Sequence, residues 1–513
     1  MERADKINPI IKMDYPDPDV IRVGDTYYMA STTMHFFPGC AILRSYDLVN
    51  WEILTYVYNR LDSTKAQRME DGGSIYGQGM WAPSLRYHKG TFYVCFAAND
   101  THKTYLYTAK AAEGPWDKKE IEGFYHDCSL LFDEDDRVYI VYGNTEIHLT
   151  ELKDDLSGPL SDGLDRVIVR ERDNHFLGYE GSHIYKIDGR YYVFFIHSLK
   201  DRWMRVQACF ASESLTGEFT GRDVFEDTLG YCNQGVAQGG IVDTPWGDWY
   251  AVLFQDHGAV GRIPVLVPMR FENGFPVMGE NGRMPQEIPY KSTRPDHVYA
   301  PLYESDDFAY QPDHNGKVTL KKVWQFNHEP ADELWEVRDN TFRISTGKLS
   351  RNPIQAQNTL TQRLLFPRCR VEVTLDAHNL NEGDYAGLCV LQGCYGMIAI
   401  RKEEGKIYLV MGAKETRDES TDLTESEREI CKEYERILLE SPKIKLYLEA
   451  DFWQMKDQAV FGYVKDGNSI QVGKVHRLFF GLDHFCGARA GLFMYSTELT
   501  GGTAVFSDFV YRC

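Results

Sequence analysis

Short apolar strands, each led in by a turn, recur through the first half of the chain at roughly fifty-residue spacing. In each copy a glycine or aspartate turn is followed by an aromatic or β-branched pair. The five copies are Gly24-Asp25-Thr26-Tyr27-Tyr28, Gly90-Thr91-Phe92-Tyr93, Asp136-Arg137-Val138-Tyr139, Gly189-Arg190-Tyr191-Tyr192 and Gly247-Asp248-Trp249-Tyr250. This spacing is the length of a four-stranded blade, so the pattern predicts an all-β, five-bladed β-propeller. An antiparallel sandwich is the alternative, but its strands usually return at shorter spacing.

The pattern changes after a proline-bearing stretch at 285–301, which we interpret as a linker. Beyond it, alternating apolar and polar residues predict strands at 369–375, 396–401, 406–411 and 487–494. Such alternation is typical of a β-sandwich. We therefore predict two all-β domains, a propeller over 1–295 and a sandwich over 296–513. The charged segment 414–438 is interpreted as a solvated hairpin or short helix.

Charge and aromatic content narrow the class of ligand. The formal net charge is −20, which argues against nucleic acid, because nucleic-acid binders need a basic surface. Aromatic residues make up 13% of the chain, and aromatic faces suit stacking on the C–H faces of sugars. The charge favours a neutral or cationic ligand. The aromatic content suits a sugar, and packing between propeller blades is its alternative explanation.

The cysteines and the N-terminus bear on location. The 11 cysteines are scattered without C-x-x-C pairs, which fits reduced thiols better than disulfides or a zinc site. Residues 1–12 contain no apolar signal-peptide core, and no run of about eighteen apolar residues occurs. We expect a cytoplasmic protein without a membrane partner. Strand edges in the second domain would permit a homo-oligomer.

Three isolated carboxylates, Asp17, Asp127 and Glu180, each stand just before an apolar strand. In a propeller the inner strands run along the central axis, so these carboxylates can meet at one end of it. Crowded acids repel, and at least one should keep its proton near neutral pH. An acid beside a base suits hydrolysis of a glycosidic bond. A single aspartate in a turn more often caps backbone N–H groups, so only the arrangement supports this interpretation.

Longer motifs resemble glycoside hydrolase family 43. In the first domain they are Asn8-Pro9-Ile10, Tyr15-Pro16-Asp17-Pro18-Asp19, Ser45-Tyr46-Asp47-Leu48-Val49-Asn50-Trp51, Met80-Trp81-Ala82-Pro83-Ser84-Leu85, Glu180-Gly181-Ser182-His183-Ile184-Tyr185-Lys186 and Gln238-Gly239-Gly240. In the second they are Trp324-Gln325-Phe326-Asn327-His328 and Asn358-Thr359-Leu360-Thr361-Gln362-Arg363, which resemble the concanavalin-like sandwich of the β-xylosidase and α-L-arabinofuranosidase branch.

The resemblance implies hydrolysis with inversion at the anomeric carbon. It assigns Asp17 as general base, Glu180 as general acid and Asp127 as the group that orients the acid and keeps its pKa raised. Asp14 and Asp19 compete for the role of base, but Asp17 alone lies between two prolines that restrict its backbone.

The resemblance also implies substrate-binding residues. They are Trp81 as a pocket wall, Arg262 as a hydrogen-bond donor to the terminal sugar, Phe36 and Phe37 at the mouth of the first blade, and His183 beside the acid. A core tryptophan and a surface arginine are the alternatives for Trp81 and Arg262. His35, His126 and His175 are expected at the rim.

No cofactor is needed for this chemistry, but several branches of the family hold a hydrated Ca²⁺ in the channel on a histidine. This chain has Leu253 at that position, which cannot bind a metal. His257, with Asp256 or Gln255, is the remaining candidate, and a hydrogen-bonded structural histidine is the alternative.

The resemblance places α-L-arabinofuranose first as the terminal sugar released from arabinoxylo-oligosaccharides, with β-D-xylose as the alternative. An endo-arabinanase would lack the long second domain. A retaining fructosidase would show an Asn-Asp-Pro-Asn-Gly type of opening, which is absent here. A non-catalytic lectin would have lost the acids, and all three are present.

Overall fold

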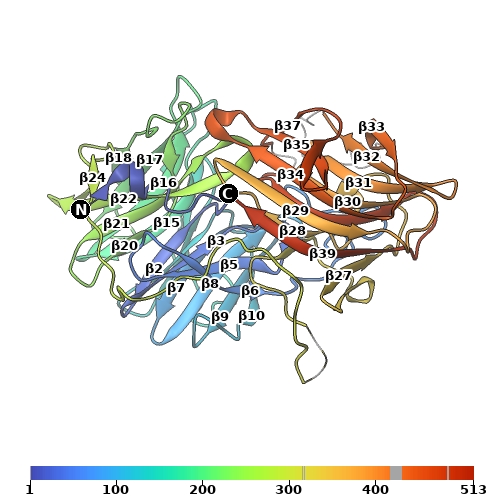
Figure 1. The fold of residues 1–513 in the computed structure, drawn as a ribbon. Helices are drawn as coiled ribbons and strands as arrows, with labels where there is room; N and C mark the ends of the chain where they lie inside the picture. The colour runs from blue at the N-terminus through green and yellow to red at the C-terminus, as the bar shows by residue number, and fades with distance from the viewer. Residues whose placement is uncertain (1, 315, 317, 416–429, 482–483) are drawn as a thin grey trace.

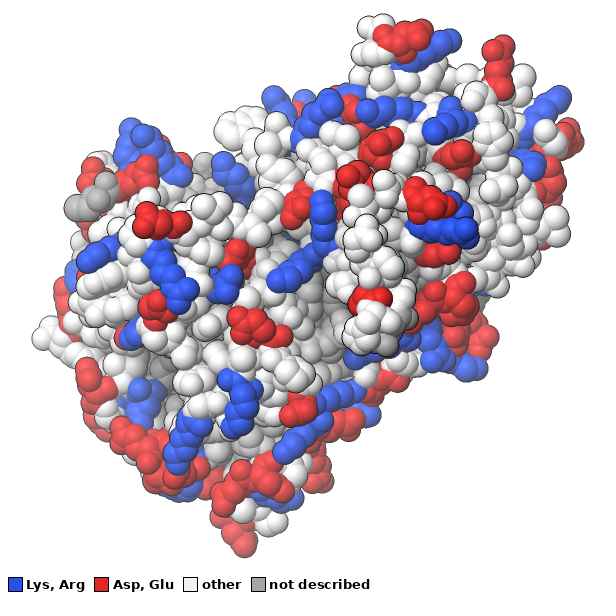
Figure 2. Space-filling model, turned by 60° about the horizontal axis from the view of Figure 1, so that its bottom comes forward, with Lys and Arg blue, Asp and Glu red and all other residues white. Residues whose placement is uncertain are grey.

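A computed structural model describes residues 2–314, 316, 318–415, 430–481 and 484–513. Two all-β bodies lie side by side, the N-terminal one coloured blue to green and the C-terminal one orange to red (Figure 1). Within the described residues, no helix has the length and apolar character needed to cross a bilayer. Acidic and basic side chains are interspersed over the face in Figure 2, which carries no continuous basic patch.

The N-terminal body is a five-bladed β-propeller, as predicted. Four blades are four-stranded antiparallel sheets in which neighbouring strands follow chain order. The first blade contains β2 (Asp19–Val23), β3 (Thr26–Ser31), β5 (Gly39–Ser45) and β6 (Glu52–Tyr58), and the second contains β7 (Met80–His88), β8 (Thr91–Ala98), β9 (Lys103–Ala109) and β10 (Asp117–Ile121). The third blade contains β11 (Ser129–Phe132), β12 (Val138–Tyr142), β13 (Glu146–Leu152) and β14 (Asp165–Arg170). The fourth contains β15 (Glu180–Ile187), β16 (Arg190–Ser198), β17 (Arg205–Ser212) and β18 (Thr220–Phe225).

The fifth blade comprises β19 (Val236–Ala237), β20 (Ile241–Asp243), β21 (Trp249–Asp256), β22 (Arg262–Glu272) and β23 (Phe275–Met278). The Gly240 N–H donates to Pro18 O over 2.9 Å, which joins this blade to the first. The predicted turn-and-aromatic copies lead into the second strand of each blade. These strands are almost wholly buried because adjacent blades cover both faces, which explains their apolar runs.

The C-terminal body is a sandwich of two antiparallel sheets around one apolar core. One sheet contains β33 (Lys432–Leu438), β32 (Lys406–Ala413), β31 (Gly396–Glu403), β30 (Asp384–Leu391), β38 (Arg489–Ser496), β28 (Leu360–Arg363), β25 (Gln325–Asn327) and β4 (Phe36–Phe37). The other contains β26 (Trp335–Arg338), β27 (Thr341–Ser345), β39 (Thr503–Arg512), β29 (Arg368–Asp376), β34 (Lys443–Asp451), β35 (Gln458–Lys465), β36 (Asn468–Gln471) and β37 (His476–Arg477).

Short elements complete the chain. They are β1 (Glu2–Arg3), which pairs with β24 (Glu287–Ile288), the helix α1 (Ala4–Ile7) and the 3₁₀ turns η1 (Gly258–Val260), η2 (Asp332–Leu334), η3 (Pro353–Gln355) and η5 (Trp453–Met455). Strand β33 forms a hairpin with β32, at the C-terminal end of the segment interpreted as a solvated excursion. The middle of that segment, 416–429, lies outside the described residues.

One strand of the sandwich comes from the propeller. Phe36 and Phe37 pair with Asn327 and Phe326 of β25, so β4 extends the first sheet of the second domain. The guanidinium of Arg489 lies 3.5 Å from the centre of the Phe36 ring, in a fully buried stack. The two domains therefore share a β-sheet, although the chain between 285 and 301 contributes little regular structure.

Asp14 forms a second connection between the domains. Its carboxylate accepts the N–H of Arg262 in the propeller and the N–H of Gly487 in the sandwich, each over 2.8 Å. The backbones approach so closely that a Cβ on Gly487 would lie 2.2 Å from Val260 O. The carboxylate is buried, so both N–H groups depend on it for a partner.

Replacing Asp14 with alanine should destabilise the protein. Two buried N–H donors would lose their acceptor, at a cost of about 1–3 kcal/mol each. We expect the Asp14→Ala variant to unfold at a clearly lower urea concentration than the unmutated protein, followed by tryptophan fluorescence. Asp154→Ala, at an exposed aspartate, is the control and should unfold with the unmutated protein. Equal midpoints for both variants would contradict this role of Asp14.

Candidate active site

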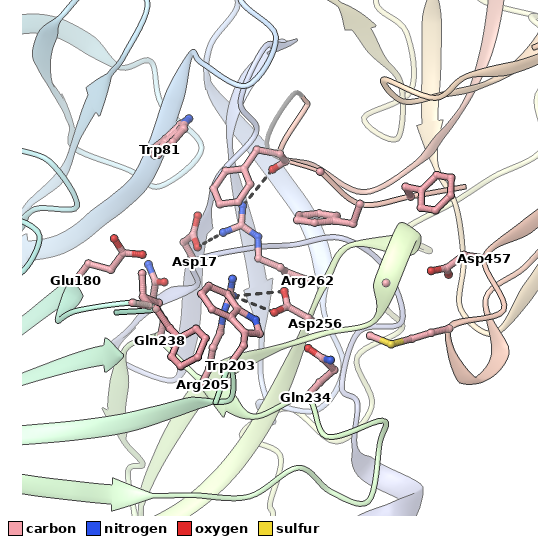
Figure 3. A pocket seen from close by; sticks show the side chains of 18 of the residues that line it. Asp17, Trp81, Glu180, Trp203, Arg205, Gln234, Gln238, Asp256, Arg262 and Asp457 are labelled. Atoms are coloured by element: carbon pink, nitrogen blue, oxygen red, sulfur yellow. Dashed lines mark hydrogen bonds and ion pairs between the residues drawn. The ribbon is translucent and has the colours of Figure 1, made fainter. Parts of the chain in front are cut away.

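A cavity of about 900 Å³ opens where the inner strands of the propeller begin, and the sandwich forms one of its walls (Figure 3). From the propeller it is lined by Asp17, Trp81, His126, Asp127, Asn144, Phe176, Leu177, Glu180, Trp203, Arg205, Gln234, Gln238, Asp256, Gly258 and Arg262. From the sandwich it is lined by Met455, Asp457, Arg477, Leu478, Phe479, Phe480, Gly481 and Phe485. The structure thus brings all three predicted carboxylates to one cavity.

Asp17 lies just before β2 with φ of 52°, between the two prolines that restrict its neighbours. The Arg262 guanidinium donates to Asp17 Oδ1 over 2.8 Å, and the Thr32 hydroxyl donates to Asp17 Oδ2 over 2.6 Å. Asp17 is buried, and so is Arg262. This fixed ion pair gives an oriented carboxylate that can accept a proton from water.

Asp127 and Glu180 form a second acidic group together with His126. One ligand atom from each of the three residues lies within 4.8 Å of the other two, and His126 Nε2 lies 3.8 Å from Asp127 Oδ1. Burial raises the pKa of Asp127 well above its usual value; His126 opposes this shift, and the charges of Glu180 and Asp17 add to it. The negative charge of Asp127, with the hydrogen bond to Glu180, raises the pKa of His126 to about 9 despite its burial.

Glu180 begins β15 and points into the cavity (Figure 3). Its carboxylate accepts the side-chain amide of Asn144 over 2.5 Å. Gly181 follows with φ of 63°, and a Cβ there would lie 2.5 Å from the side-chain amide carbon of Gln238. Glycine is therefore required for the chain to turn Glu180 toward the substrate.

Asp14 and Asp19, the competing candidates for the base, do not line the cavity. Asp14 connects the domains, as described above. Asp19 is fully buried and accepts hydrogen bonds from the Leu85 N–H over 2.7 Å and from Arg86 over 2.6 Å. Burial raises the pKa of Asp19, but Arg86, His183 and the Leu85 N–H together hold it below its usual value. Both residues have structural roles.

The predicted sugar-binding residues divide into two groups. Trp81 and Arg262 line the cavity, and the Arg262 guanidinium lies 4.6 Å from the centre of the Phe485 ring. Phe36 and Phe37 do not, because both are buried in β4 against the sandwich. His183 is also placed away from the lining, with its Nδ1 3.2 Å from Asp19 Oδ1. These three side chains do not line the main cavity, although His183 lines a small pocket beside Asp17 and Asp127, and their contact with a sugar stays a prediction.

The other predicted histidines lie in different surroundings. His126 lines the cavity, whereas His35 is buried at the domain junction and His175 is exposed outside the lining. His257 Nε2 lies 3.0 Å from Gln255 Oε1, and its ring stacks on Tyr231 at 4.0 Å.

The surroundings of His257 do not suit Ca²⁺, which binds six to eight oxygen ligands. Phe366 packs against the His257 ring at 4.7 Å. Asp256 is paired with Arg205 over 3.2 Å instead. Within the described residues, these contacts favour the hydrogen-bonded structural histidine, and a calcium ion in the channel stays a prediction.

Several lining residues were not predicted as site residues. Gln238 lies in a motif that carried the family resemblance, and Asn144 follows a glycine turn, so both had a local signal. Trp203, Arg205 and Phe485 had none, because they reach the cavity only through the packing of blades and domains. Phe485 packs on Trp81 at 5.2 Å, which makes the sandwich part of the site.

Comparison with known proteins agrees with the two-domain fold. Residues 7–276 match the model of glycosyl hydrolases family 43, and residues 313–512 match the beta xylosidase C-terminal concanavalin A-like domain. A solved structure described as a bifunctional GH43-CE of Bacteroides eggerthii is 40% identical with a TM-score of 0.88; the similarity covers 100% of this chain and 63% of that one. This chain therefore spans less than two thirds of that relative.

Two curated relatives carry different names. A beta-xylosidase of Formosa agariphila is 26% identical over 98% of this chain and 90% of its own length. A non-reducing end alpha-L-arabinofuranosidase of Bacteroides ovatus is 28% identical over 65% of this chain and 63% of its own length.

A propeller with three carboxylates at its axial cavity, joined to a concanavalin-like sandwich, defines a glycoside hydrolase. The chain belongs to glycosyl hydrolases family 43.

Replacing Asp127 with asparagine should lower the pKa of His126 from about 9 toward the ordinary imidazole value of 6.5, because the charge of Asp127 is the largest cause of its elevation. The measurement is an NMR titration of the protein labelled at histidine Cε1, with the His126 signal assigned from a His126→Asn variant. Asp256→Asn, at a cavity carboxylate paired with Arg205, is the control and should leave the titration unchanged. An unaltered His126 pKa in Asp127→Asn would contradict the coupling.

Proposed function

We propose that this chain is an exo-acting, inverting hydrolase that removes terminal α-L-arabinofuranosyl residues from arabinoxylo-oligosaccharides. The observation that carries the proposal is the difference between the acids of one cavity. Asp17 is held by an arginine and a hydroxyl, whereas Glu180 lies beside the buried Asp127, whose pKa is raised. One group thus suits proton acceptance and the other proton donation.

The proposed reaction has one displacement. Glu180 donates its proton to the glycosidic oxygen as the bond to the anomeric carbon breaks. Asp17 takes a proton from the water whose oxygen attacks that carbon from the opposite face. Asp127 has a carboxylate oxygen within 4.8 Å of one on Glu180, and burial with the charges of Glu180 and Asp17 raises the pKa of Asp127, so this group can hold a proton beside the leaving oxygen. The sugar leaves with inverted configuration.

The sandwich supports action at chain ends. Phe485 packs against both Trp81 and Arg262, and the Phe485 carbonyl accepts from the Arg262 guanidinium over 3.4 Å. This contact puts a wall beside the Asp17 and Arg262 pair, which supports a pocket for a terminal sugar. The remaining cavity, lined by Phe176 and Trp203 among others, leaves room for the rest of an oligosaccharide.

A β-D-xylosidase is the second candidate. It is favoured by the relative from Formosa agariphila, which is named a beta-xylosidase and matches 98% of this chain. Arabinofuranose stays first because of the segment 254–264, which resembles the branch in which arabinofuranosidases predominate, and because the relative from Bacteroides ovatus carries that name.

Glu180 and Asp17 should respond differently to the leaving group. General acid catalysis contributes about 10²–10⁴-fold, and a good leaving group needs less of it. We expect Glu180→Ala to lose kcat/KM by that factor on an arabinoxylo-oligosaccharide but far less on 4-nitrophenyl α-L-arabinofuranoside. Asp17→Ala should lose activity on both substrates. Glu134→Ala, at an exposed glutamate, is the control. Equal losses for Glu180→Ala on both substrates would contradict the assignment.

Sugar preference and stereochemistry are tested together. We expect the unmutated protein to cleave 4-nitrophenyl α-L-arabinofuranoside faster than 4-nitrophenyl β-D-xyloside, and Asp17→Asn to cleave neither. Proton NMR during early turnover should show the β-anomer of arabinofuranose first, because water attacks the face opposite the leaving group. Preference for the xyloside would make the protein a β-xylosidase, and initial release of the α-anomer would refute inversion.

A further inference from the structure

A buried cluster of metal-ligating side chains lies behind the wall of the active site. It consists of His35, just before β4 in the propeller, and His484 and Cys486 in the sandwich segment that leads into β38. One ligand atom from each residue lies within 4.8 Å of the other two. All three side chains are buried, so the cluster is separate from the solvent-open cavity.

His35 has the least explained environment of the three. Its side chain is fully buried, and neither ring nitrogen has a hydrogen-bond partner among the described residues. A buried imidazole without a partner costs free energy that a bound ion would recover. The Tyr76 ring at 4.7 Å and the Phe36 ring at 4.3 Å pack around His35.

The chemistry of the ligand set selects the metal. Two imidazoles and one thiolate are the ligands that Zn²⁺ prefers, whereas Ca²⁺ and Mg²⁺ require oxygen. Both imidazoles are buried and come from different domains, so they approach the Cys486 sulfur from opposite sides of the domain junction. Tetrahedral zinc sets its ligand atoms about 3.3–3.8 Å apart, so small side-chain rotations would bring these atoms together.

His328 is adjacent but already engaged. Its ring centre lies 5.1 Å from that of His35, its Nε2 accepts the Ile75 N–H over 2.9 Å, and its Nδ1 lies 3.1 Å from Asn327 Oδ1. The site therefore has three protein ligands, and a water molecule would complete a tetrahedron.

We propose that His35, His484 and Cys486 form a zinc site that joins the propeller to the sandwich and fixes the wall of the active site. Phe485 lies between two of the ligands in sequence, and its ring and carbonyl contact Arg262, the partner of Asp17. Zinc bound to its neighbours would hold Phe485 against Arg262. The site thus connects a metal to the Asp17 and Arg262 ion pair through Phe485.

Zinc binding is tested on the full chain, purified with a chelator and a phosphine reductant. Zn²⁺ is titrated in competition with a chromophoric chelator, and Co²⁺ serves as a spectroscopic probe. We expect one high-affinity ion per chain and a thiolate-to-cobalt charge-transfer band. Cys486→Ala and His35→Phe should each weaken zinc binding by about 100-fold or more and, for Cys486→Ala, abolish the band. Cys389→Ala, at a buried cysteine of the same apolar cluster, is the matched control and should bind like the unmutated protein.

The outcomes distinguish this cluster from the catalytic one, where His126, Asp127 and Glu180 also lie close together. Zinc at the catalytic acids would survive both variants and give no thiolate band, and that result would overturn the proposal. Circular dichroism shows whether each variant folds. If Cys486→Ala does not fold, the zinc affinity of His35→Phe tests the proposal. Hydrogen exchange of peptides that contain Phe485 should slow with zinc in the unmutated protein and in Cys389→Ala only; equal slowing in His35→Phe would refute the effect on the wall.

Discussion

The buried ion pair between Asp17 and Arg262 is the interaction on which the site depends. A charge removed from water must be paired, and these two side chains pair across 245 residues of sequence. The backbone N–H of Arg262 is held by Asp14, whose other oxygen holds Gly487 of the sandwich. The orientation of the proposed base is therefore set by both domains at once.

Burial and the repulsion between neighbouring carboxylates control the pKa values in the second group of acids. Burial of Asp127, with Glu180 and Asp17 nearby, favours its neutral form, and His126 partly opposes this effect. Asp19 is buried at least as deeply, but Arg86, His183 and a backbone N–H hold its pKa below the usual value despite its burial. Two aspartates of similar depth thus have opposite protonation preferences, and the difference lies in their neighbours.

The sandwich is part of the catalytic unit as well as an attached domain. It takes β4 from the propeller into its sheet, and it supplies Phe485 to the cavity. The same segment carries His484 and Cys486 toward His35, so the domain junction and the cavity wall share one stretch of backbone. A change at the junction would therefore act on the Asp17 and Arg262 pair through Phe485.

Local sequence patterns were sufficient to predict the blades and the meeting of three acids at one end of the propeller axis. Turn-and-aromatic repeats are local patterns that can be recognised in the sequence. The start of an inner strand has a fixed place in a propeller, so Asp17, Asp127 and Glu180 could be predicted to lie close together. The sequence could not place Phe36 and Phe37, whose aromatic pattern is the same in a cavity mouth as in a buried edge strand. Nor could it find Phe485, or separate Asp14 from Asp17 except by the neighbouring prolines. Those positions were decided by contacts between segments hundreds of residues apart, and such contacts leave no periodic trace in either segment.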